Sequence, residues 1–289
     1  MLNTVRFNEN YIIGQDCVLV LGGFDGLHIG HKSLVSRAKE YGLPVGIMSI
    51  VGGKDGESLF TKQERERVFA SVGADFTFFL PFESIRDMSA EDFIKMLVDE
   101  YAPKAFVCGE DFRFGKGALG TPALLKEITR VPVEVQPLLV IDGEKVSASA
   151  IKKLLATGET ARANERLGDA FFLMGTVERD RQIGRTIGFP TANIVYPSGK
   201  FPLKIGVYES FVQVNGNGYK GITNYGARPT FDNAKVCTET YLDGFDGDLY
   251  GKQLTVCFLR YLRDIKKFEN ATALKAQLDE DIRRVREDD

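Results

Sequence analysis

Short apolar runs and amphipathic segments alternate along the first half of the chain. The apolar runs predict strands at residues 18–21, 44–50, 74–80 and 104–108, and residues 131–140 are predicted to be extended. The segments between them predict helices at residues 31–41, 61–72, 89–100 and 121–130, the second with a capping-box signature at Thr61 and Glu64. Strands separated by helices of this length are typical of a parallel sheet covered on both faces. Ligands of such sheets bind beyond the carboxyl ends of the strands.

The second half of the chain reads mostly as strands joined by tight turns. Strand candidates lie at residues 171–177, 205–214, 219–224, 235–242 and 253–259. A strong hairpin signal between two of them is the turn Asn215-Gly216-Asn217-Gly218. A last helix is predicted at residues 271–286. This order predicts an antiparallel barrel with a closing helix, and the polar stretch 157–169 is interpreted as the linker between two domains.

Composition supports a two-domain globular protein and narrows its partners. The 289 residues suffice for two domains, with 44% hydrophobic and 27% charged residues. The formal net charge of -3 provides no overall positive field, so we expect no nucleic-acid partner. We see no signal peptide and no apolar run of ~20 residues, so we expect a cytoplasmic protein with no membrane partner. The four cysteines form no CxxC pair and are interpreted as free thiols of a reducing compartment.

The two histidines of the chain mark the first candidate site. His28 and His31 follow a strand and a glycine-rich turn, and they lie where the next helix opens. Glycines let the backbone approach a ligand closely, and free amides at a helix start hold phosphate oxygens. The histidines can add hydrogen bonds or positive charge, which suits a triphosphate whose α-phosphorus is attacked. The alternatives are two surface histidines at a turn, or a zinc pair that lacks a third nearby ligand.

Two segments of the first half resemble a known family. The first, Gly22-Gly23-Phe24-Asp25-Gly26-Leu27-His28-Ile29-Gly30-His31, resembles the HxGH signature of nucleotidyltransferases. It is most similar to the N-terminal domain of the bacterial bifunctional riboflavin kinase/FMN adenylyltransferase (FAD synthetase) family. The second, Cys108–Lys116, resembles that family's Gly-x-Asp-Phe-x-Phe-Gly loop. The resemblance implies catalytic roles for His28 and His31, ATP binding by Gly23, Phe24 and Gly30, and flavin binding by Gly109, Asp111, Phe112 and Phe114.

The same half departs from the family pattern at two places. Residues 49–54 contain neither the histidine nor the prolines of the family's Pro-His-Pro-like segment. The family's triphosphate-binding Ser-Ser-Thr-Arg-Ile-Arg motif is replaced by Ser147-Ala148-Ser149-Ala150-Ile151-Lys152. Ser147, Ser149 and Lys152 are the remaining ATP-binding candidates, but lysine does not reproduce the bidentate contact of arginine. The sequence therefore leaves open an adenylyltransferase that is slow, altered or absent.

A second candidate site begins with a glycine-rich loop that leads into a strand. The segment Gly184-Arg185-Thr186-Ile187-Gly188-Phe189-Pro190-Thr191-Ala192-Asn193 can cradle phosphates with its backbone amides. A threonine hydroxyl and an asparagine carbonyl are oxygen ligands suited to Mg²⁺ held jointly with ATP. The segment resembles the GxTxGFPTAN motif of riboflavin kinases. The resemblance implies that Thr191 and Asn193 bind the metal and that ATP is bound by Gly184, Arg185, Gly188, Pro190, Thr191 and Asn193.

Further segments resemble riboflavin kinases in the same order. They are Gly206-Val207-Tyr208, the turn at 224–231, Glu239-Thr240-Tyr241-Leu242, Asp248-Leu249-Tyr250-Gly251 and Arg263 before Phe268. The resemblance assigns Glu239 as the base that takes the hydroxyl proton of riboflavin, and it implies flavin binding by Asp248, Leu249, Tyr250 and Arg263. From spacing alone, Glu239 reads more readily as a strand-face carboxylate paired with an arginine than as a base. Tyr250 reads equally as an ordinary core or turn aromatic.

These observations predict a Rossmann-like α/β nucleotidyltransferase-type (HxGH) domain at residues 1–160. They predict an antiparallel β-barrel riboflavin kinase domain with a C-terminal helix at residues 167–289. The expected enzyme makes FMN from riboflavin and FAD from FMN, with ATP and Mg²⁺, as a monomer or weak homo-oligomer. One alternative is a monofunctional riboflavin kinase whose first domain is inactive or regulatory. The other is a flavin-binding regulator of RNA or DNA, which the negative charge disfavours.

Overall fold

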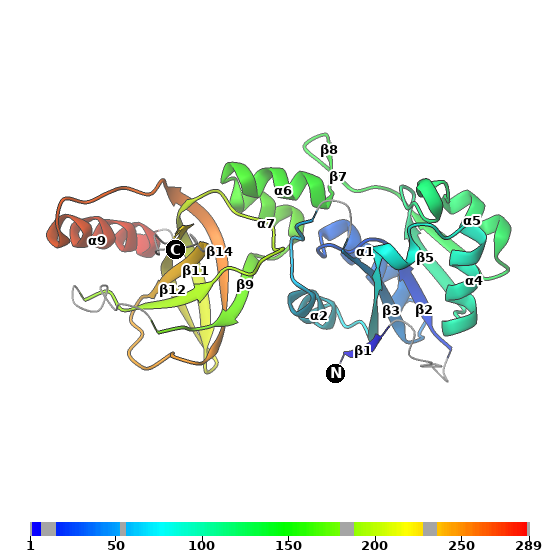
Figure 1. Cartoon of the computed structure of the whole chain (residues 1–289), viewed down its shortest axis with the longest axis horizontal. Helices are drawn as coiled ribbons and strands as arrows, with labels where there is room; N and C mark the ends of the chain where they lie inside the picture. The colour runs from blue at the N-terminus through cyan, green and yellow to red at the C-terminus, as the bar shows by residue number, and fades with distance from the viewer. Residues whose placement is uncertain (1, 7–15, 53–55, 180–187, 228–235, 288–289) are drawn as a thin grey trace. The chain divides into compact units, whose positions relative to one another are not determined.

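The computed structural model describes residues 2–6, 16–52, 56–179, 188–227 and 236–287. The chain separates into two compact units, Met1–Ala150 and Ile151–Asp289 (Figure 1). Each unit has its own sheet, and each is described here by itself. Within the described segments, no helix is both long and apolar enough to cross a bilayer. The four cysteines are free thiols, and Cys17, Cys108 and Cys237 are buried.

The first unit is a parallel sheet with helices on both faces. Its strands are β1 (Asn3–Arg6), β2 (Val18–Leu21), β3 (Val45–Val51), β4 (Phe76–Pro81), β5 (Ala105–Gly109) and β6 (Val133–Gln136). Its helices are α1 (Ile29–Lys39), α2 (Lys62–Ser71), α3 (Phe82–Ile85), α4 (Ala90–Tyr101) and α5 (Pro122–Ile128), with a 3₁₀ turn at Lys116–Ala118 and a small hairpin of β7 (Val140–Ile141) and β8 (Glu144–Lys145). The strand order is β1-β4-β3-β2-β5-β6, so the direction of winding reverses between β2 and β5. In parallel sheets, this switch point is where ligands bind.

Alternate side chains of the central strand β2 feed two separate cores. Val18 and Val20 pack with α1 and with Phe69 of α2 on one face. Leu19 and Leu21 pack with Phe93 and Leu97 of α4 on the other face. Because both faces are covered, the strand is apolar at every position instead of alternating. The switch point is therefore held by a rigid, fully buried strand.

The second unit is an antiparallel sheet that curls until its edges meet. It begins with α6 (Ala148–Thr157, which starts in the first unit) and α7 (Thr160–Leu167). Its strands are β9 (Phe171–Thr176), β10 (Thr191–Val195), β11 (Gly206–Val214), β12 (Asn217–Ala227), β13 (Val236–Leu242) and β14 (Gln253–Arg263), followed by α9 (Ala271–Glu287). The order is β10-β13-β12-β11-β14-β9. A backbone bridge from Glu178 to Asn193 (N···O 2.8 Å) then joins the two edges, which is how a barrel removes unpaired strand edges.

The edges can approach because a glycine faces a branched side chain. A Cβ atom placed on Gly175 of β9 would lie 2.2 Å from Cγ2 of Ile194 on β10. Glycine in a strand interior is unfavourable unless another chain segment must come close. Here Gly175 provides the space in which Ile194, itself 1% exposed, fills the seam of the barrel.

The two faces of the curled sheet have different coverings. On one face, Thr223 donates to Ser210 and shares a hydrogen bond with Thr240 (both 2.9 Å), and all three side chains are fully buried. On the other face, Ile282 and Val285 of α9 pack over Val207 and Ile222. The helix is also held at its C-terminal end, where Arg286 bonds Asp243. The face beneath α9 is the one that carries the candidate kinase residues.

The predicted fold class is confirmed for both units, with local differences. The stretch 157–169, interpreted as a linker, contains helix α7, because Ala163, Arg166 and Leu167 form a buried face that packs on β9 and β14. The extended run 131–140 contains only β6 and the start of β7. The last strand runs on to Arg263 instead of ending at 259. The domain limits 1–160 and 167–289 stay a prediction.

Replacing Gly175 with alanine should open the barrel seam. The added methyl group overlaps Ile194, so we expect the free energy of unfolding of the second unit to fall by about 1–3 kcal/mol. Chemical denaturation followed by circular dichroism measures this change. In an Ile194→Ala background, which removes Cγ2, Gly175→Ala should cost much less. Equal costs in both backgrounds would show that the seam contact is not the cause.

Candidate active sites

A tight turn carries the chain from β2 into α1 at the switch point of the first unit. Phe24 adopts a positive φ of 44°, which is uncommon for a residue with a side chain. Its ring folds back over Gly22, where a Cβ atom would lie 2.7 Å from the ring. The turn is tied to β3 by Ile50 N donating to Gly23 O at 3.0 Å. This strained but well-anchored turn delivers His28 to the start of α1.

A buried arginine braces the same turn from α2. Arg65 is 3% exposed, and its Nη2 bonds Oδ1 of Asp25 at 2.9 Å. Its Nη1 donates to Ser49 Oγ at 3.1 Å, and Ser49 in turn donates to Phe24 O at 3.3 Å. Asp25 also accepts from Leu59 N at 2.8 Å. Ser49 belongs to the stretch that lacks the family's histidine, so this position serves here to hold the loop.

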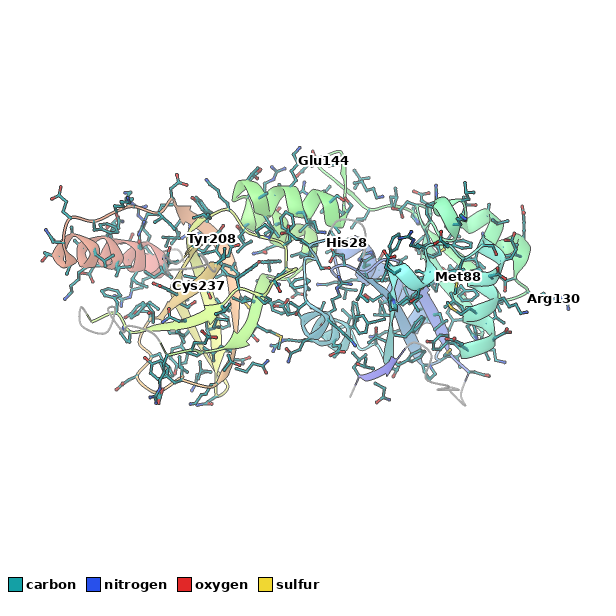
Figure 2. All side chains as sticks on the ribbon, in the orientation of Figure 1. His28, Met88, Arg130, Glu144, Tyr208 and Cys237 are labelled. Atoms are coloured by element: carbon teal, nitrogen blue, oxygen red, sulfur yellow. The ribbon has the colours of Figure 1, made fainter. Side chains whose placement is uncertain are left out.

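The backbone sets the tautomers of the two histidines. Nδ1 of His28 accepts from the backbone N–H of His31 at 3.2 Å, as the N-cap of α1, so its proton lies on Nε2. Nδ1 of His31 lies 2.7 Å from the carbonyl of Gly26 and must donate to it. The two rings stack with centroids 3.6 Å apart. His28 therefore offers an Nε2–H donor, and His31 an Nε2 acceptor, beside the free amides of the helix start. Figure 2 labels His28 at this position.

Burial keeps both histidines neutral at physiological pH. Desolvation, helped by the nearby His31, lowers the pKa of His28 to about 2. Desolvation also lowers the pKa of His31 to about 4, against the opposing hydrogen bond to Gly26. Of the two roles considered for these histidines, hydrogen bonding is the one that these lowered pKa values favour. They act as hydrogen-bonding groups, and Lys145 lowers both pKa values further.

Lys145 is a site residue that the sequence analysis missed. It lies at the end of the β7–β8 hairpin and forms an ion pair with Asp111, which follows β5. Both charges are close enough to His28 to shift its pKa in opposite directions. The pair thus brings the loops after β5 and β8 to the histidines of the β2–α1 turn. Only its position two residues before Ser147 could have marked Lys145 in advance.

The aromatic loop after β5 is packed into the core. Phe112 and Phe114 are 7% and 5% exposed, and their ring centroids lie 5.4 Å apart. Phe114 also stacks on Phe93 of α4 at 5.7 Å. Gly115 has φ +70°, and a Cβ there would meet backbone atoms of Ala90 at 2.9 Å. The packed rings therefore hold the loop against the core. Flavin binding by Gly109, Asp111, Phe112 and Phe114 stays a prediction.

The altered triphosphate motif occupies the start of α6. Ser147 accepts a hydrogen bond from Ala150 N at 3.2 Å and so caps the helix. Ser149 is exposed. The Nζ atom of Lys152 lies 5.7 Å from the ring of Phe201 in the second unit. ATP binding by Gly23, Phe24, Gly30, Ser147, Ser149 and Lys152 stays a prediction.

In the second unit, strand register aligns the predicted kinase residues. Asn193 of β10 pairs with Glu239 of β13, and Glu239 pairs with Asn224 of β12. Directly paired residues lie on the same face of a sheet, with Cβ atoms roughly 5 Å apart. Thr191 lies on this face too, two residues before Asn193. We call Asn193, Glu239 and Asn224 the cross-strand row.

A pocket adjoins one end of this row. It is lined by Val177, Pro190, Thr191, Ala192, Asn193, Leu242, Phe245, Asp246, Gly247, Asp248, Leu249 and Tyr250. Predicted metal and ATP residues thus share a pocket with the predicted flavin residues of the 248–250 turn. Asp248 shapes that turn by accepting from Tyr250 N at 2.9 Å. Gly188 is exposed with φ +87°, and Gly184 and Arg185 lie outside the described residues.

Arg263 is bound to α9. Its Nη2 lies 2.6 Å from Asp281, and Nε lies 3.0 Å from both oxygens of that carboxylate. Asp281 is 1% exposed, so this bidentate pair anchors the helix to β14. Arg263 pairs with Val207 and lies on the same face as the cross-strand row. Its role in flavin binding stays a prediction.

The oxygen donors of Thr191 and Asn193 suit a magnesium ion shared with a nucleotide. Both residues line the pocket, and Asn193 is 6% exposed. Among the described residues, no group of three His, Cys, Asp or Glu side chains forms a metal cage. Mg²⁺ often binds to few protein ligands and takes its remaining ligands from phosphates and water. The donor set present fits such a site.

The two units together have the architecture of a nucleotidyltransferase-type domain joined to a kinase-type barrel. Family models described as FAD synthetase and riboflavin kinase match residues 12–150 and 167–288. A bifunctional riboflavin kinase/FMN adenylyltransferase of Pseudomonas fluorescens is 31% identical, over 94% of this chain and 93% of its own length. The enzyme of that name from Escherichia coli K12 is 32% identical with the same coverage. The chain belongs to the bifunctional riboflavin kinase/FMN adenylyltransferase family.

A solved structure shares the whole fold. It is named a macrolide-efflux protein from Streptococcus pneumoniae, and it superposes with a TM-score of 0.89 at 27% identity. The match covers 99% of each chain. That protein's name describes efflux, whereas this chain matches the FAD synthetase and riboflavin kinase family models directly.

Acidification should destabilise the first unit through its histidines. Their pKa values in the folded chain, about 2 and 4, lie below the ordinary 6.5, so the unfolded chain takes up protons first. Stability is therefore lost as pH falls from about 6.5, by up to about 2 kcal/mol per histidine at pH 5. Calorimetric unfolding at pH 7 and pH 5 measures the loss. His28→Gln with His31→Gln removes every imidazole of the chain and should flatten the pH dependence relative to wild type. An unchanged slope would contradict the burial argument.

Proposed function

We propose that this chain phosphorylates riboflavin to FMN and adenylylates FMN to FAD, with ATP as the second substrate of both reactions. Family models for both domains match the chain in succession, and the bifunctional relatives align with 94% of it. Because that alignment runs through both units, it favours a bifunctional enzyme over a riboflavin kinase with an inactive first domain.

The observation that carries the kinase proposal is the register that aligns Asn193 with Glu239. The terminal ribityl hydroxyl of riboflavin attacks the γ-phosphorus of ATP. An oxygen–phosphorus bond forms, the bond to ADP breaks, and Glu239 accepts the hydroxyl proton. A carboxylate suits this role because the attacking group is a neutral alcohol that must lose its proton.

Thr191 and Asn193 are proposed to hold Mg²⁺ together with the phosphates of ATP. Their hydroxyl and carbonyl oxygens are the donors this ion prefers. The bound ion supplies positive charge that neutralises the phosphoryl group during transfer. Gly188 and Pro190, with Gly184 and Arg185 before them, are proposed to line the nucleotide side of the same site.

Adenylylation by the first unit does not require a protein group that takes a proton from the attacking oxygen. An oxygen of the FMN phosphate attacks the α-phosphorus of ATP, and pyrophosphate leaves. A phosphate monoester has a second pKa near ~6, so it attacks without giving up a proton to the protein. Neutral His28 supports this proposal, because its Nε2–H can donate to a phosphate oxygen at the start of α1. His31 lies beside it and offers its Nε2 atom as a hydrogen-bond acceptor.

Glu239→Gln should nearly abolish FMN formation while leaving riboflavin binding intact. The amide keeps the shape of the side chain but cannot take a proton, and a positioned base contributes ~10²–10⁴-fold to rate. Steady-state assays with riboflavin, ATP and Mg²⁺ measure kcat, and flavin fluorescence measures binding. Glu165→Gln, on an exposed position of α7, is the matched control. Normal turnover by the Glu239 variant would refute its role as the base.

His28→Ala with His31→Ala should remove FAD formation without affecting riboflavin kinase activity. The variant loses the donor at the helix start but alters nothing in the second unit. Incubation with FMN, ATP and Mg²⁺, followed by detection of FAD and pyrophosphate, measures the first activity. Wild-type protein that makes FMN but no FAD would support the monofunctional alternative. Loss of both activities in the variant would contradict two separable sites.

A further inference from the structure

The cross-strand row contains a residue for which the sequence analysis gave no role. Asn224 of β12 pairs directly with Glu239, on the side opposite to Asn193. Its Oδ1 atom is buried and has no hydrogen-bond partner among the described residues. A buried acceptor without a donor is unfavourable and rare in native proteins, and such atoms commonly mark a binding site. Among the described residues the atom has no donor, so a bound ligand can supply one.

The orientation of Asn224 is set by its neighbours on β12. Thr223 and Tyr225 are 0% and 1% exposed on the opposite face of the sheet. Thr223 is hydrogen-bonded to Ser210, and Tyr225 packs edge-on against Tyr196 at 4.9 Å. Because strand side chains alternate between faces, these contacts hold Asn224 on the face of Glu239. The orphaned oxygen is thus a feature of the strand register.

The next position of β12 on that face is apolar and lacks a side chain. A Cβ atom on Gly226 would lie 2.8 Å from Ile265 and 3.5 Å from Ile205. These two isoleucines are 45% and 53% exposed, which is unusual for large aliphatic residues. Asn224 therefore lies between a carboxylate and an exposed apolar pair. Two residues along a strand span about 7 Å, and adjacent strands lie about 5 Å apart.

We propose that Asn224 binds the ribityl chain of riboflavin, with Oδ1 accepting a hydrogen bond from a ribityl hydroxyl. This inference rests on the proposed kinase function. The terminal hydroxyl then lies at Glu239, the ribityl chain at Asn224, and the flavin ring against Ile205 and Ile265. Riboflavin carries its terminal hydroxyl, its other ribityl hydroxyls and its apolar ring in that order. This face of the sheet offers a carboxylate, an amide oxygen and two isoleucines in the same order.

The same orientation assigns the opposite end of the row to the nucleotide. Thr191, Asn193 and the 248–250 turn share one pocket beyond Glu239, whereas Asn224 lies on the other side of that carboxylate. Phosphoryl transfer needs the donor and the acceptor on opposite sides of the reacting group. The 248–250 turn then contacts ATP instead of the flavin ring expected from the family resemblance.

Lumiflavin, which has the ring of riboflavin but a methyl group in place of the ribityl chain, separates these contacts. For Asn224→Ala in the full-length protein, we expect the Kd for riboflavin to rise roughly tenfold. The Kd for lumiflavin, the KM for ATP and the Mg²⁺ dependence should remain unchanged. Fluorescence titration with each flavin and steady-state kinetics give these values. Asn217→Ala, at an exposed position of the same strand, is the control and should behave as wild type.

A second variant protects the test against simple loss of structure. Asn224→Asp keeps the accepting oxygen and should hold riboflavin affinity within about threefold of wild type. Equal weakening of riboflavin and lumiflavin, or a change only in the ATP or Mg²⁺ dependence, would overturn the proposal. So would wild-type riboflavin affinity in the alanine variant, provided that the wild-type protein makes FMN. Failure of wild-type protein to make FMN would instead refute the kinase function itself.

Discussion

The chemistry of the second unit depends on the backbone register between β10, β13 and β12. Side chains alternate across a strand, so a shift of one residue would turn Glu239 to the opposite face and separate it from Asn193. The buried hydroxyl cluster of Ser210, Thr223 and Thr240 opposes such a shift, because any slip would bury these groups without partners. The polar interior of the sheet thus fixes the position of the polar row on its other face. Structure and function are joined here by a single set of strand pairings.

In the first unit, the candidate site residues are positioned by side-chain contacts and not by strand pairing. Its site lies on loops after parallel strands, where no ladder of hydrogen bonds sets the side chains. The buried guanidinium of Arg65 takes over that task by joining Asp25, Ser49 and the carbonyl of Ile50. Removing it would leave the half-buried carboxylate of Asp25 without its charged partner, and it would also remove the bonds that hold Ser49 and Ile50. The strained turn at Phe24 is stable because this network determines its shape.

The sequence was most informative where structure depends on local patterns. Apolar runs predicted the strands of both sheets, and Thr61 with Glu64 forms the capping box that their spacing indicated. The Asn215-Gly216 turn has two positive φ angles, as its hairpin requires. Helix α7 was missed because its stretch is polar overall, although Leu167 and Ala163 bury one face against the sheet. Local composition hides an amphipathic helix of only two turns.

In both candidate sites, only residues that belong to a recognisable sequence motif could be given a role in advance. Motif residues such as Thr191, Asn193 and Glu239 carry a recognisable local pattern, and register then shows which of them meet. Lys145 has no such signal, and the motif turn that begins at Asn224 does not show what Asn224 contacts. The importance of both residues comes from partners distant in sequence: Glu239 across a strand pair for Asn224, and Asp111 across a loop for Lys145. Contacts of this kind depend on non-local pairing, which periodicity does not encode.

The two candidate sites also differ in the charges of the side chains that face their substrates. The cross-strand row places the carboxylate of Glu239 between two neutral amides, which suits an alcohol that must lose a proton. At the nucleotidyltransferase site the histidines are neutral, and Lys145, the cation beside them, is already paired with Asp111. Ala150 adds no positive charge where the family has an arginine. Among the described residues, the groups that this candidate site offers to a triphosphate are the backbone amides at the start of α1 and Lys145, once Lys145 leaves Asp111. An ion pair that opens when ATP arrives would exchange one anionic partner for another, so phosphate binding at this candidate site would not depend on an arginine at position 150.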